Sequence, residues 1–223
     1  MALYDFHMHT FFSDGELLPT ELIRRCIDKG YSALAITDHA SASNIPTLLD
    51  QLRRDAELVM EHWGFQVLPG VELTHVPPAS IAKLARQAKD AGAQVVVVHG
   101  ETLVEPVPPG TNQASVECPD VDILAHPGLL TLEQAKLAER NGLFLEITSR
   151  GGHCLGNGNT ALVARETGAL LLVNSDTHAP RDIHTEAFAR VVAQGAGLSD
   201  IEVEQTLHVN PLKLIARVGQ VRA

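Results

Sequence analysis

The sequence predicts an α/β fold, a distorted TIM-like barrel in which seven parallel strands alternate with helices. A strand pattern followed by a helical pattern recurs seven times along the chain. Strands that are apolar on both faces, such as residues 95–98, are typical of a parallel sheet covered by helices. Nearly every predicted strand also ends in a polar residue, which favours a barrel with one central site over an open sheet that uses few strand ends. Seven strands instead of eight predict that the barrel is distorted.

The elements follow one another in this order. The predicted strands are Ala2–His7, Ala33–Thr37, Gln66–Glu72, Gln94–His99, Asp122–His126, Leu143–Thr148 and Leu170–Ser175. The helical patterns between them are Pro19–Lys29, Ile45–His62, Ser80–Ala91, Leu132–Arg140 and Asn159–Thr167. Pro19 and Thr131 suit helix starts. Glycines suited to helix C-termini follow, at Gly30, Gly64, Gly92, Gly142 and Gly168. The segment from Ser199 reads as two short helices, the last opened by Asn210-Pro211.

Two connections are longer than a compact barrel needs. More than twenty residues separate His99 from Asp122, and residues 114–117 could form a helical turn among them. A loop of this length is usually a binding loop or lid. The second connection, residues 150–158, contains four glycines that would let the backbone approach a ligand closely. Irregular surface loops are the alternative for both.

Composition bounds the class of protein. The chain has 223 residues, which fits one domain spanning 1–223, and 45% hydrophobic residues are enough for a sizeable core. A net charge of −10 argues against a general nucleic-acid-binding surface. It does not exclude an anionic substrate, because two or three bound divalent ions would reverse the local charge.

The cellular setting is predicted from what the sequence shows of cysteines and apolar runs. Three cysteines at irregular spacing, without a CxxC pair, suit a reducing cytosol better than a disulfide framework. No signal-peptide pattern is visible, and the longest apolar stretches are only strand-sized. We therefore expect a soluble, cytoplasmic protein with no membrane partner.

Histidines and carboxylates gather where the predicted strands stop. His7 and His9 are two apart on an extended strand end, so both side chains point the same way and can bind one ion, with Asp176 from the last strand. The full set of candidate ligands is His7, His9, Asp14, His39, Glu72, His99, His126, Asp176 and His178. Imidazole and carboxylate ligands suit Zn²⁺, Mn²⁺ or Fe²⁺, and nine are too many for one ion. The sequence therefore indicates a multinuclear metal hydrolase.

Each candidate also has an ordinary interpretation. A single histidine at a strand end is usually a hydrogen-bonded core or surface residue, and it is the recurrence that favours metal binding. Asp14 lies in Ser13-Asp14-Gly15, which is also a good turn sequence. Asp5 and Asp38 are expected to orient neighbouring histidines or to cap a turn. The remaining histidines receive no ligand role, namely His62, His75, His153, His184 and His208, although His153 could contact substrate.

These residues resemble the motifs of the polymerase and histidinol phosphatase (PHP) superfamily of phosphoesterases over nearly the whole chain. Four motifs carry the resemblance, in the family's order: the pair His7 and His9, Thr37-Asp38-His39, Gly70-Val71-Glu72 and Asp176-Thr177-His178. His99 and His126 fill the two middle motifs. The resemblance implies a distorted (β/α)7 barrel with a trinuclear metal site.

The resemblance also implies a division of the ligands among three ions. The first ion would be held by His7, His9, Glu72 and Asp176, the second by Glu72 as a bridge with His99 and His126, and the third by Asp14, His39 and His178. Some family members have histidine where this chain has Asp14. The carboxylate adds negative charge, which favours Mn²⁺ or Fe²⁺ over Zn²⁺.

The implied reaction is hydrolysis of a small phosphomonoester, as in histidinol-phosphate phosphatases. The site would hold two to three divalent metal ions, and a hydroxide bridging two of them would be the nucleophile. Glu72, Arg150 and His178 are the predicted catalytic residues. Arg150, Arg181 and His153 are the predicted substrate-binding residues: the two arginines because a guanidinium fork suits a phosphate group, and His153 because it lies in the glycine-rich loop. Glu146 could lie inside the barrel beneath the ions. Acidic residues of the 100–119 loop, Glu101 and Glu105, could contact an amine of the substrate.

Other functions remain as alternatives. A nucleotide or oligonucleotide phosphoesterase of the same family is the main one, but the acidic charge and the absence of basic, aromatic-rich loops favour a small substrate over a nucleic-acid polymer. A non-catalytic RNA-processing subunit would be expected to lose ligands and to show a basic face. An amidohydrolase commonly has a Lys or Glu bridge on strand four and a lone Asp on the last strand, whereas this chain has His99 and the pair Asp176 and His178.

Overall fold

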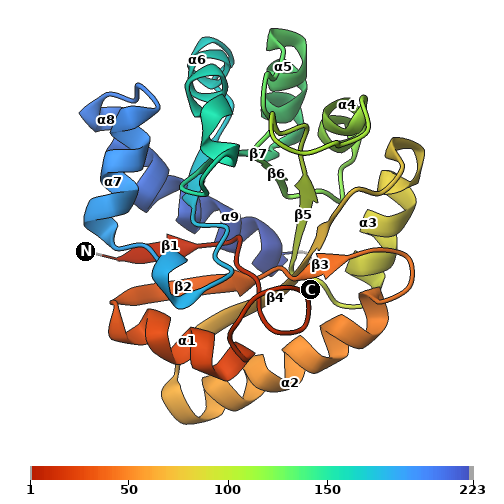
Figure 1. Cartoon of the computed structure of the whole chain (residues 1–223), viewed down its shortest axis with the longest axis vertical. Coiled ribbons are helices and arrows are strands. Elements are labelled where there is room, and N and C mark those ends of the chain that lie inside the picture. Colours follow the sequence, from red (N-terminus) through yellow and green to blue (C-terminus); the bar gives the residue numbers. More distant parts are fainter. Residues whose placement is uncertain (1, 221–223) are drawn as a thin grey trace.

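A ring of parallel strands surrounded by helices forms the fold, described here for residues 2–220 in a computed structural model (Figure 1). The strands are β1 (Leu3–Asp5), β2 (Tyr31–Ile36), β3 (His39–Ala40), β4 (Gln66–Leu73), β5 (Val95–His99), β6 (Ile123–Ala125), β7 (Phe144–Thr148) and β8 (Leu171–Asn174). Their order is β1-β2-β4-β5-β6-β7-β8, and β3 is a two-residue strand beside β4. The prediction of a distorted seven-stranded barrel is confirmed.

Helices follow the strands and cover the outside of the ring, with α1 and α2 on one side and α5 and α6 on the other (Figure 1). They are α1 (Pro19–Asp28), α2 (Ile45–Trp63), α3 (Ile81–Asp90), α4 (Thr111–Glu117), α5 (Leu132–Asn141), α6 (Asn157–Thr167), α7 (Glu186–Gly195), α8 (Asp200–Glu204) and α9 (Asn210–Gln220). Thr131 caps α5 through a capping box with Gln134, and Gly142 ends that helix with a φ of 64°. The expected helical turn in the first long loop is α4. The sequence analysis did not identify α7 or β3.

Short helical turns complete the connections. They are the 3-10 turns η1 (Pro78–Ser80), η2 (His153–Gly156) and η3 (Pro180–Asp182), and the π-helical turn η4 (Gln205–Val209) between α8 and α9. Within residues 2–220, no helix combines the length and the apolar character needed to cross a membrane.

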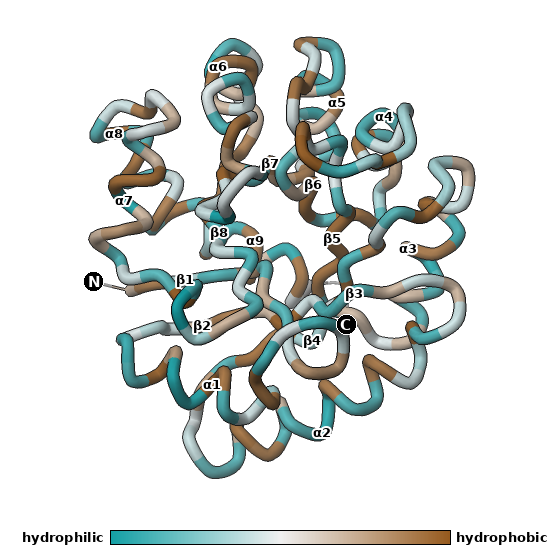
Figure 2. The backbone as a smooth tube through the Cα atoms, viewed as in Figure 1, coloured by the Kyte–Doolittle hydropathy of each residue, from teal (hydrophilic) through white to brown (hydrophobic). Residues whose placement is uncertain are grey.

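Apolar side chains fill the barrel in two layers, and apolar residues follow β5 and β6 in Figure 2. Between the strands and the outer helices lies the larger core, to which the helices contribute residues such as Leu22, Leu52 and Leu84. Inside the ring lies a smaller group from the strands, including Phe6, Ala35, Leu68, Val97, Ile123, Phe144 and Leu172. Leu214 and Val218 of α9 pack against this inner group, so the last helix closes the interior of the ring on one side. The site must therefore lie at the opposite end, where the strands finish.

The ring closes between its first and last strands in an irregular way. Among the described residues, Met8 and Thr177 form an isolated parallel bridge, in which the His9 amide donates to the Thr177 carbonyl at 2.8 Å. Side chains supply the remaining links. The Phe6 amide donates to Asn174 Oδ1 at 2.9 Å, and the Ser175 amide donates to Asp5 Oδ2 at 3.0 Å. The distortion of the barrel is located at this seam.

Asp5 therefore has a structural role that the sequence left open. Its carboxylate accepts hydrogen bonds from the backbone amides of His7 and Ser175, which join β1 to the end of β8. Burial raises the pKa of Asp5 to about 7, against the lowering effect of these hydrogen bonds.

Gly70 explains why the third motif begins with glycine. A Cβ atom at this position of β4 would lie 2.6 Å from the Val95 carbonyl oxygen of β5 and 2.9 Å from a Thr37 methyl carbon. Any side chain would therefore push the two strands apart. Since Glu72 is two residues further along the same strand, glycine here allows the close strand pairing that positions this carboxylate.

Candidate metal centre

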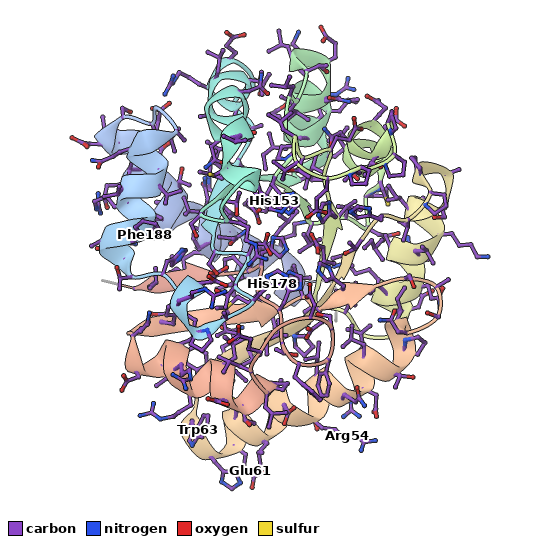
Figure 3. The ribbon with its side chains drawn as sticks, in the orientation of Figure 1. Arg54, Glu61, Trp63, His153, His178 and Phe188 are labelled. Atoms are coloured by element: carbon purple, nitrogen blue, oxygen red, sulfur yellow. The ribbon has the colours of Figure 1, made fainter. Side chains whose placement is uncertain are left out.

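The structure brings all nine predicted ligands together at the ends of the strands. They come from the β1 end and the loop after it, from β3, β4 and β5, and from the ends of β6 and β8, as His7, His9, Asp14, His39, Glu72, His99, His126, Asp176 and His178. In Figure 3 His178 lies near the middle of the ring, whereas Arg54, Glu61 and Trp63 lie on the outer helix α2.

The deepest group consists of His7, His9 and Asp176, whose ligand atoms lie within 4.8 Å of one another. His7 Nε2 is 3.2 Å from Glu72 Oε1, and His9 Nε2 is 3.2 Å from Asp176 Oδ1. His7 Nε2, His9 Nε2 and Glu72 Oε1 are buried without a hydrogen-bond partner. Buried polar atoms of this kind are normally satisfied, so a cation between them is the simplest physical explanation. These are the residues that the resemblance assigns to the first ion.

Glu146 determines which nitrogen of His7 faces this group. Its Oε2 lies 2.7 Å from His7 Nδ1 and accepts from Asn174 Nδ2 at 2.9 Å, while its Oε1 accepts from the His126 amide at 3.3 Å. A proton on His7 Nδ1 leaves the lone pair on Nε2, which is the arrangement that metal-binding histidines usually have. The structure thus places Glu146 inside the barrel beneath the ligands.

A second group lies nearer to solvent and combines Asp14, His39 and His178. Asp14 Oδ1 is 3.4 Å from His39 Nε2 and 3.2 Å from His178 Nε2. Burial raises the pKa of Asp14, but hydrogen bonds with His178 and His39 outweigh it and hold the pKa well below its usual range. These are the residues that the resemblance assigns to the third ion.

Asp38 holds the loop that carries Asp14. It accepts hydrogen bonds from the Thr10 amide, the Thr10 hydroxyl and the Ser13 hydroxyl at 2.6–2.7 Å. Of the two roles expected for Asp38, capping a turn is the one that these contacts support. Asp14 can therefore lie in a turn and also belong to the group of candidate ligands.

Glu72 occupies the centre of the whole cluster. Its carboxylate is 2.7 Å from His39 Nδ1, 3.2 Å from His7 Nε2 and 3.8 Å from both His9 Nε2 and His126 Nε2. Burial raises its pKa, but His7, His99 and His39 outweigh this and keep the pKa well below its usual range. A buried carboxylate with histidines on several sides has the position that a bridging ligand requires.

The backbone is strained at two of the predicted ligands. His126 has a φ of 26° and Asp176 a φ of 53°, in the left-handed region that residues other than glycine rarely adopt; His75, with a φ of 52°, shares this feature. Strain of about 1–3 kcal/mol per residue persists when the surroundings impose it, and it concentrates at functional sites.

The predicted substrate-binding residues lie at different depths. Arg150 is part of the wall of a cavity of about 160 Å³ that the ligands also line, and its Nη1 lies 3.4 Å from both Asp182 Oδ2 and the Asp176 carbonyl oxygen. His153 is buried in the same wall, with Nδ1 2.9 Å from Thr102 Oγ1. Arg181 has a largely exposed side chain 3.7 Å from Glu16, and it lines a neighbouring cavity of about 400 Å³. Arg150 lines both cavities.

Two polar residues of the site were not predicted as ligands. Glu105, in the first long loop, lies 3.0 Å from His75 Nε2, 3.2 Å from His99 Nε2 and 3.3 Å from His153 Nε2. The sequence offered only a weak signal for Glu105, as an acidic residue of a loop expected to bind substrate. His75 lies two residues beyond the end of β4, and its sequence did not distinguish it from a surface histidine.

The fold and the site together define a class of protein, a β/α barrel with a cluster of histidines and carboxylates at the carboxyl ends of its strands that is suited to divalent metal ions. Comparison with known proteins specifies it further. The model of the PHP domain matches residues 5–102. The uncharacterized protein MJ1295 of Methanocaldococcus jannaschii is 50% identical over 216 residues, which are 96% of this chain and 99% of that protein. The chain belongs to the PHP family, as its motifs predicted.

More distantly similar proteins match nearly the whole chain or have the same fold. Ribonuclease P protein component 3 of Methanosarcina mazei is 27% identical over 229 residues, covering 96% of this chain and 89% of that protein. A solved structure from Bifidobacterium adolescentis, described as a metal-dependent phosphoesterase, superposes with a TM-score of 0.51 at 19% identity, covering 90% of this chain and 98% of that one. At that identity the likeness concerns the fold alone.

Proposed function

We propose that this protein is a metal-dependent phosphoesterase that hydrolyses a small phosphomonoester at a site for two to three divalent ions, Zn²⁺, Mn²⁺ or Fe²⁺. One observation carries the proposal: buried nitrogen and oxygen atoms of His7, His9 and Glu72 face one another without hydrogen-bond partners. A cation would satisfy all of them at once. Membership of the PHP family supports the reaction class.

The groups of side chains suggest how the ions would be held. His7, His9, Asp176 and Glu72 would hold the first, Glu72 with His99 and His126 the second, and Asp14, His39 and His178 the third. Bound ions would make a water molecule acidic enough to act as nucleophile near neutral pH and would neutralise charge on the phosphate.

The residues of the chain supply positioning around these ions. Glu146 accepts a hydrogen bond from His7 Nδ1 and so keeps the proton of this ring on Nδ1. The Asp176 carbonyl oxygen, 2.9 Å from His178 Nδ1, has the same effect on the ring of His178. Arg150 stands at the cavity wall with its guanidinium shared between Asp182 and a backbone carbonyl at long distances of 3.4 Å. A phosphate group offers it shorter, charge-assisted bonds, so we propose Arg150 as the phosphate-binding residue.

The cavities favour a small substrate. A volume of about 160 Å³ is below the ~300–1,000 Å³ of drug-sized ligand pockets, so it suits a phosphate group and little else. The neighbouring cavity of about 400 Å³ could take the rest of the molecule, and Arg181, Phe188 and Thr185 line it. Under this proposal Arg181 contacts the organic part of the substrate, whereas His153 lines the smaller cavity that receives the phosphate.

Replacing Arg150 by alanine tests the phosphate contact. Loss of one charge-assisted hydrogen bond, worth about 1.5–3 kcal/mol, should raise KM for a phosphomonoester about 10- to 100-fold. Metal content should stay unchanged, because Arg150 is not a ligand. Arg24→Ala is the matched control, since Arg24 is exposed and pairs only loosely with Asp28. An unchanged KM in the Arg150 variant would assign the phosphate contact to another residue.

An RNA-directed function is the second candidate. The similarity to a ribonuclease P subunit over 96% of the chain favours it, whereas the net charge of −10 opposes it. Elemental analysis combined with a panel of histidinol phosphate, nucleotides and 5′-phosphorylated RNA separates the two. Two to three ions per chain with release of phosphate from a small substrate would support the proposal. Ions with cleavage of RNA alone would favour the second candidate, and a chain without ions or turnover after addition of Mn²⁺ would exclude a metal-dependent enzyme.

A further inference from the structure

A carboxylate from a loop faces a second set of histidines at the mouth of the site. Glu105 lies in the segment between β5 and α4, outside the nine residues that the family motifs supply. Its Oε2 is 3.2 Å from His99 Nε2 and 3.0 Å from His75 Nε2, and its Oε1 is 3.3 Å from His153 Nε2. Three imidazole nitrogens thus surround one carboxylate.

The hydrogen bonds on the opposite side of two rings show what faces Glu105. His99 Nδ1 lies 3.2 Å from the Gly100 carbonyl oxygen, which can only accept, so the proton is on Nδ1. His153 Nδ1 lies 2.9 Å from the Thr102 hydroxyl, which can also accept. With the Thr102 hydroxyl accepting from His153 Nδ1, neutral rings at both positions direct the Nε2 lone pair at the carboxylate. A cation between these lone pairs and the anion would turn their repulsion into attraction.

The distances suit a metal ion in that position. Two ligand atoms about 2.1 Å from one ion, at roughly 90–110° to each other, are about 3.0–3.4 Å apart. The separations of Glu105 from His99 and His153 fall in this range. The ligand atoms of His99, His126 and His153 also lie within 4.8 Å of one another, and the rings of His126 and His153 are 4.3 Å apart.

The loop is built to hold Glu105 in place. Glu101 accepts hydrogen bonds from the amides of Gly110 and Asn112 at 3.0 and 2.9 Å, which ties the two ends of the loop together. Thr102 connects the same loop to His153, so the carboxylate and the imidazole are positioned as a unit. The strained backbone of His75, with a φ of 52°, places its ring against Glu105 from the third side.

We propose that Glu105 and His153 are ligands of the second ion, together with His99 and His126, and that His75 is a positioning residue that orients the Glu105 carboxylate. This inference rests on the proposed function, because it needs a metal centre, and it replaces the substrate contact predicted for His153 with a structural link to the metal. The second ion would then be bound by two residues from loops as well as by strand ends. The first and third ions do not depend on them.

The test is metal binding itself. Metal-free wild-type protein and the variants Glu105→Gln and His153→Gln would be titrated with Co²⁺, with the number of ions measured by elemental analysis, their affinities by competition with a chelator, and their coordination by the visible absorption of Co²⁺. Glu61→Gln and His62→Gln on the outer helix α2 are matched controls, since both side chains are exposed. Glu61 lies on the outside of the molecule, far from His153 and His178 (Figure 3). Circular dichroism of each metal-free variant checks that it is folded.

Each variant should bind one Co²⁺ at least about tenfold more weakly than wild type, with a changed absorption spectrum, while the controls and the other ions are unaffected. His75→Gln should weaken the same ion by a smaller factor. If the Glu105 and His153 variants bind all ions as wild type does, the inference is wrong and the proposed function stands. If the wild-type protein binds no ion, both are wrong.

Discussion

Glu72→Gln is expected to lower phosphoesterase activity at least about 10³-fold, corresponding to about 4 kcal/mol of transition-state stabilisation, and to remove one or two ions per chain. The reason is its central position, within 3.8 Å of four imidazole groups. Glutamine has nearly the same size but carries no charge, so it would remove the proposed bridge while the packing of β4 is retained. Activity assays and elemental analysis of the purified variant measure both effects.

The barrel of this variant should remain folded, because Gly70 and the pairing of β4 with β5 do not depend on the carboxylate. Glu61→Gln, at an exposed position of α2, controls for the general effect of removing one negative charge. Full activity with an unchanged number of ions in the Glu72 variant would contradict its role as a bridge. Unfolding of the variant would show instead that the buried charge is needed for the fold.

Removal of the ions with a chelator is expected to abolish activity and to lower the thermal stability of the protein. An ion present at 100 times its Kd adds about 2.7 kcal/mol to the free energy of unfolding. For a chain of this size about 1 kcal/mol shifts Tm by roughly 2–4 °C, so each ion should contribute about 5–10 °C. The metal-free site also keeps a costly arrangement, since burial raises the pKa of Asp176 to about 7, beside His7, Glu72 and His178.

Thermal unfolding with and without Mn²⁺ or Zn²⁺ measures this effect, and readdition should restore both Tm and activity. Mg²⁺ at the same concentration is a useful control, because imidazole-rich sites bind it weakly. Equal Tm values for the chelated and metal-loaded protein would show that the buried histidines and carboxylates are satisfied without a cation, which the proposal does not allow.

Much of the fold and of the site could be predicted because both depend on local patterns. The apolar run before each strand end and the polar residue after it are neighbours in sequence, so the sheet and the nine candidate ligands could be found together. The two-residue strand β3 was missed because it has no pattern of its own and exists only through its pairing with Glu72 and Leu73. The missed α7 did have a signal, since Thr185 caps it and accepts from the Phe188 amide.

The rest of the site depends on contacts between loops, which leave no periodic pattern. Glu105 and His153 are 48 positions apart, and they meet where Thr102 connects their loops. Arg150 could be placed near the site from its position after β7. Its ion pair with Asp182 could not be predicted. Loop residues therefore need the three-dimensional arrangement before a role can be assigned to them.

The irregular seam between β1 and β8 gives the proposed ions a second consequence. Its hydrogen bonds join residues 168 and 170 positions apart, so closing the ring closes a very long loop of the chain. His7 and His9 stand on one side of the seam and Asp176 on the other, and an ion bound to all three would cross-link them. Bringing β1 and β8 together lowers the entropy of the chain. Metal coordination would then offset this loss, together with a few hydrogen bonds. Amide hydrogens at the seam, those of Phe6 and His9, should accordingly exchange with solvent faster in the metal-free protein, while those in the middle of β4 and β5 should not.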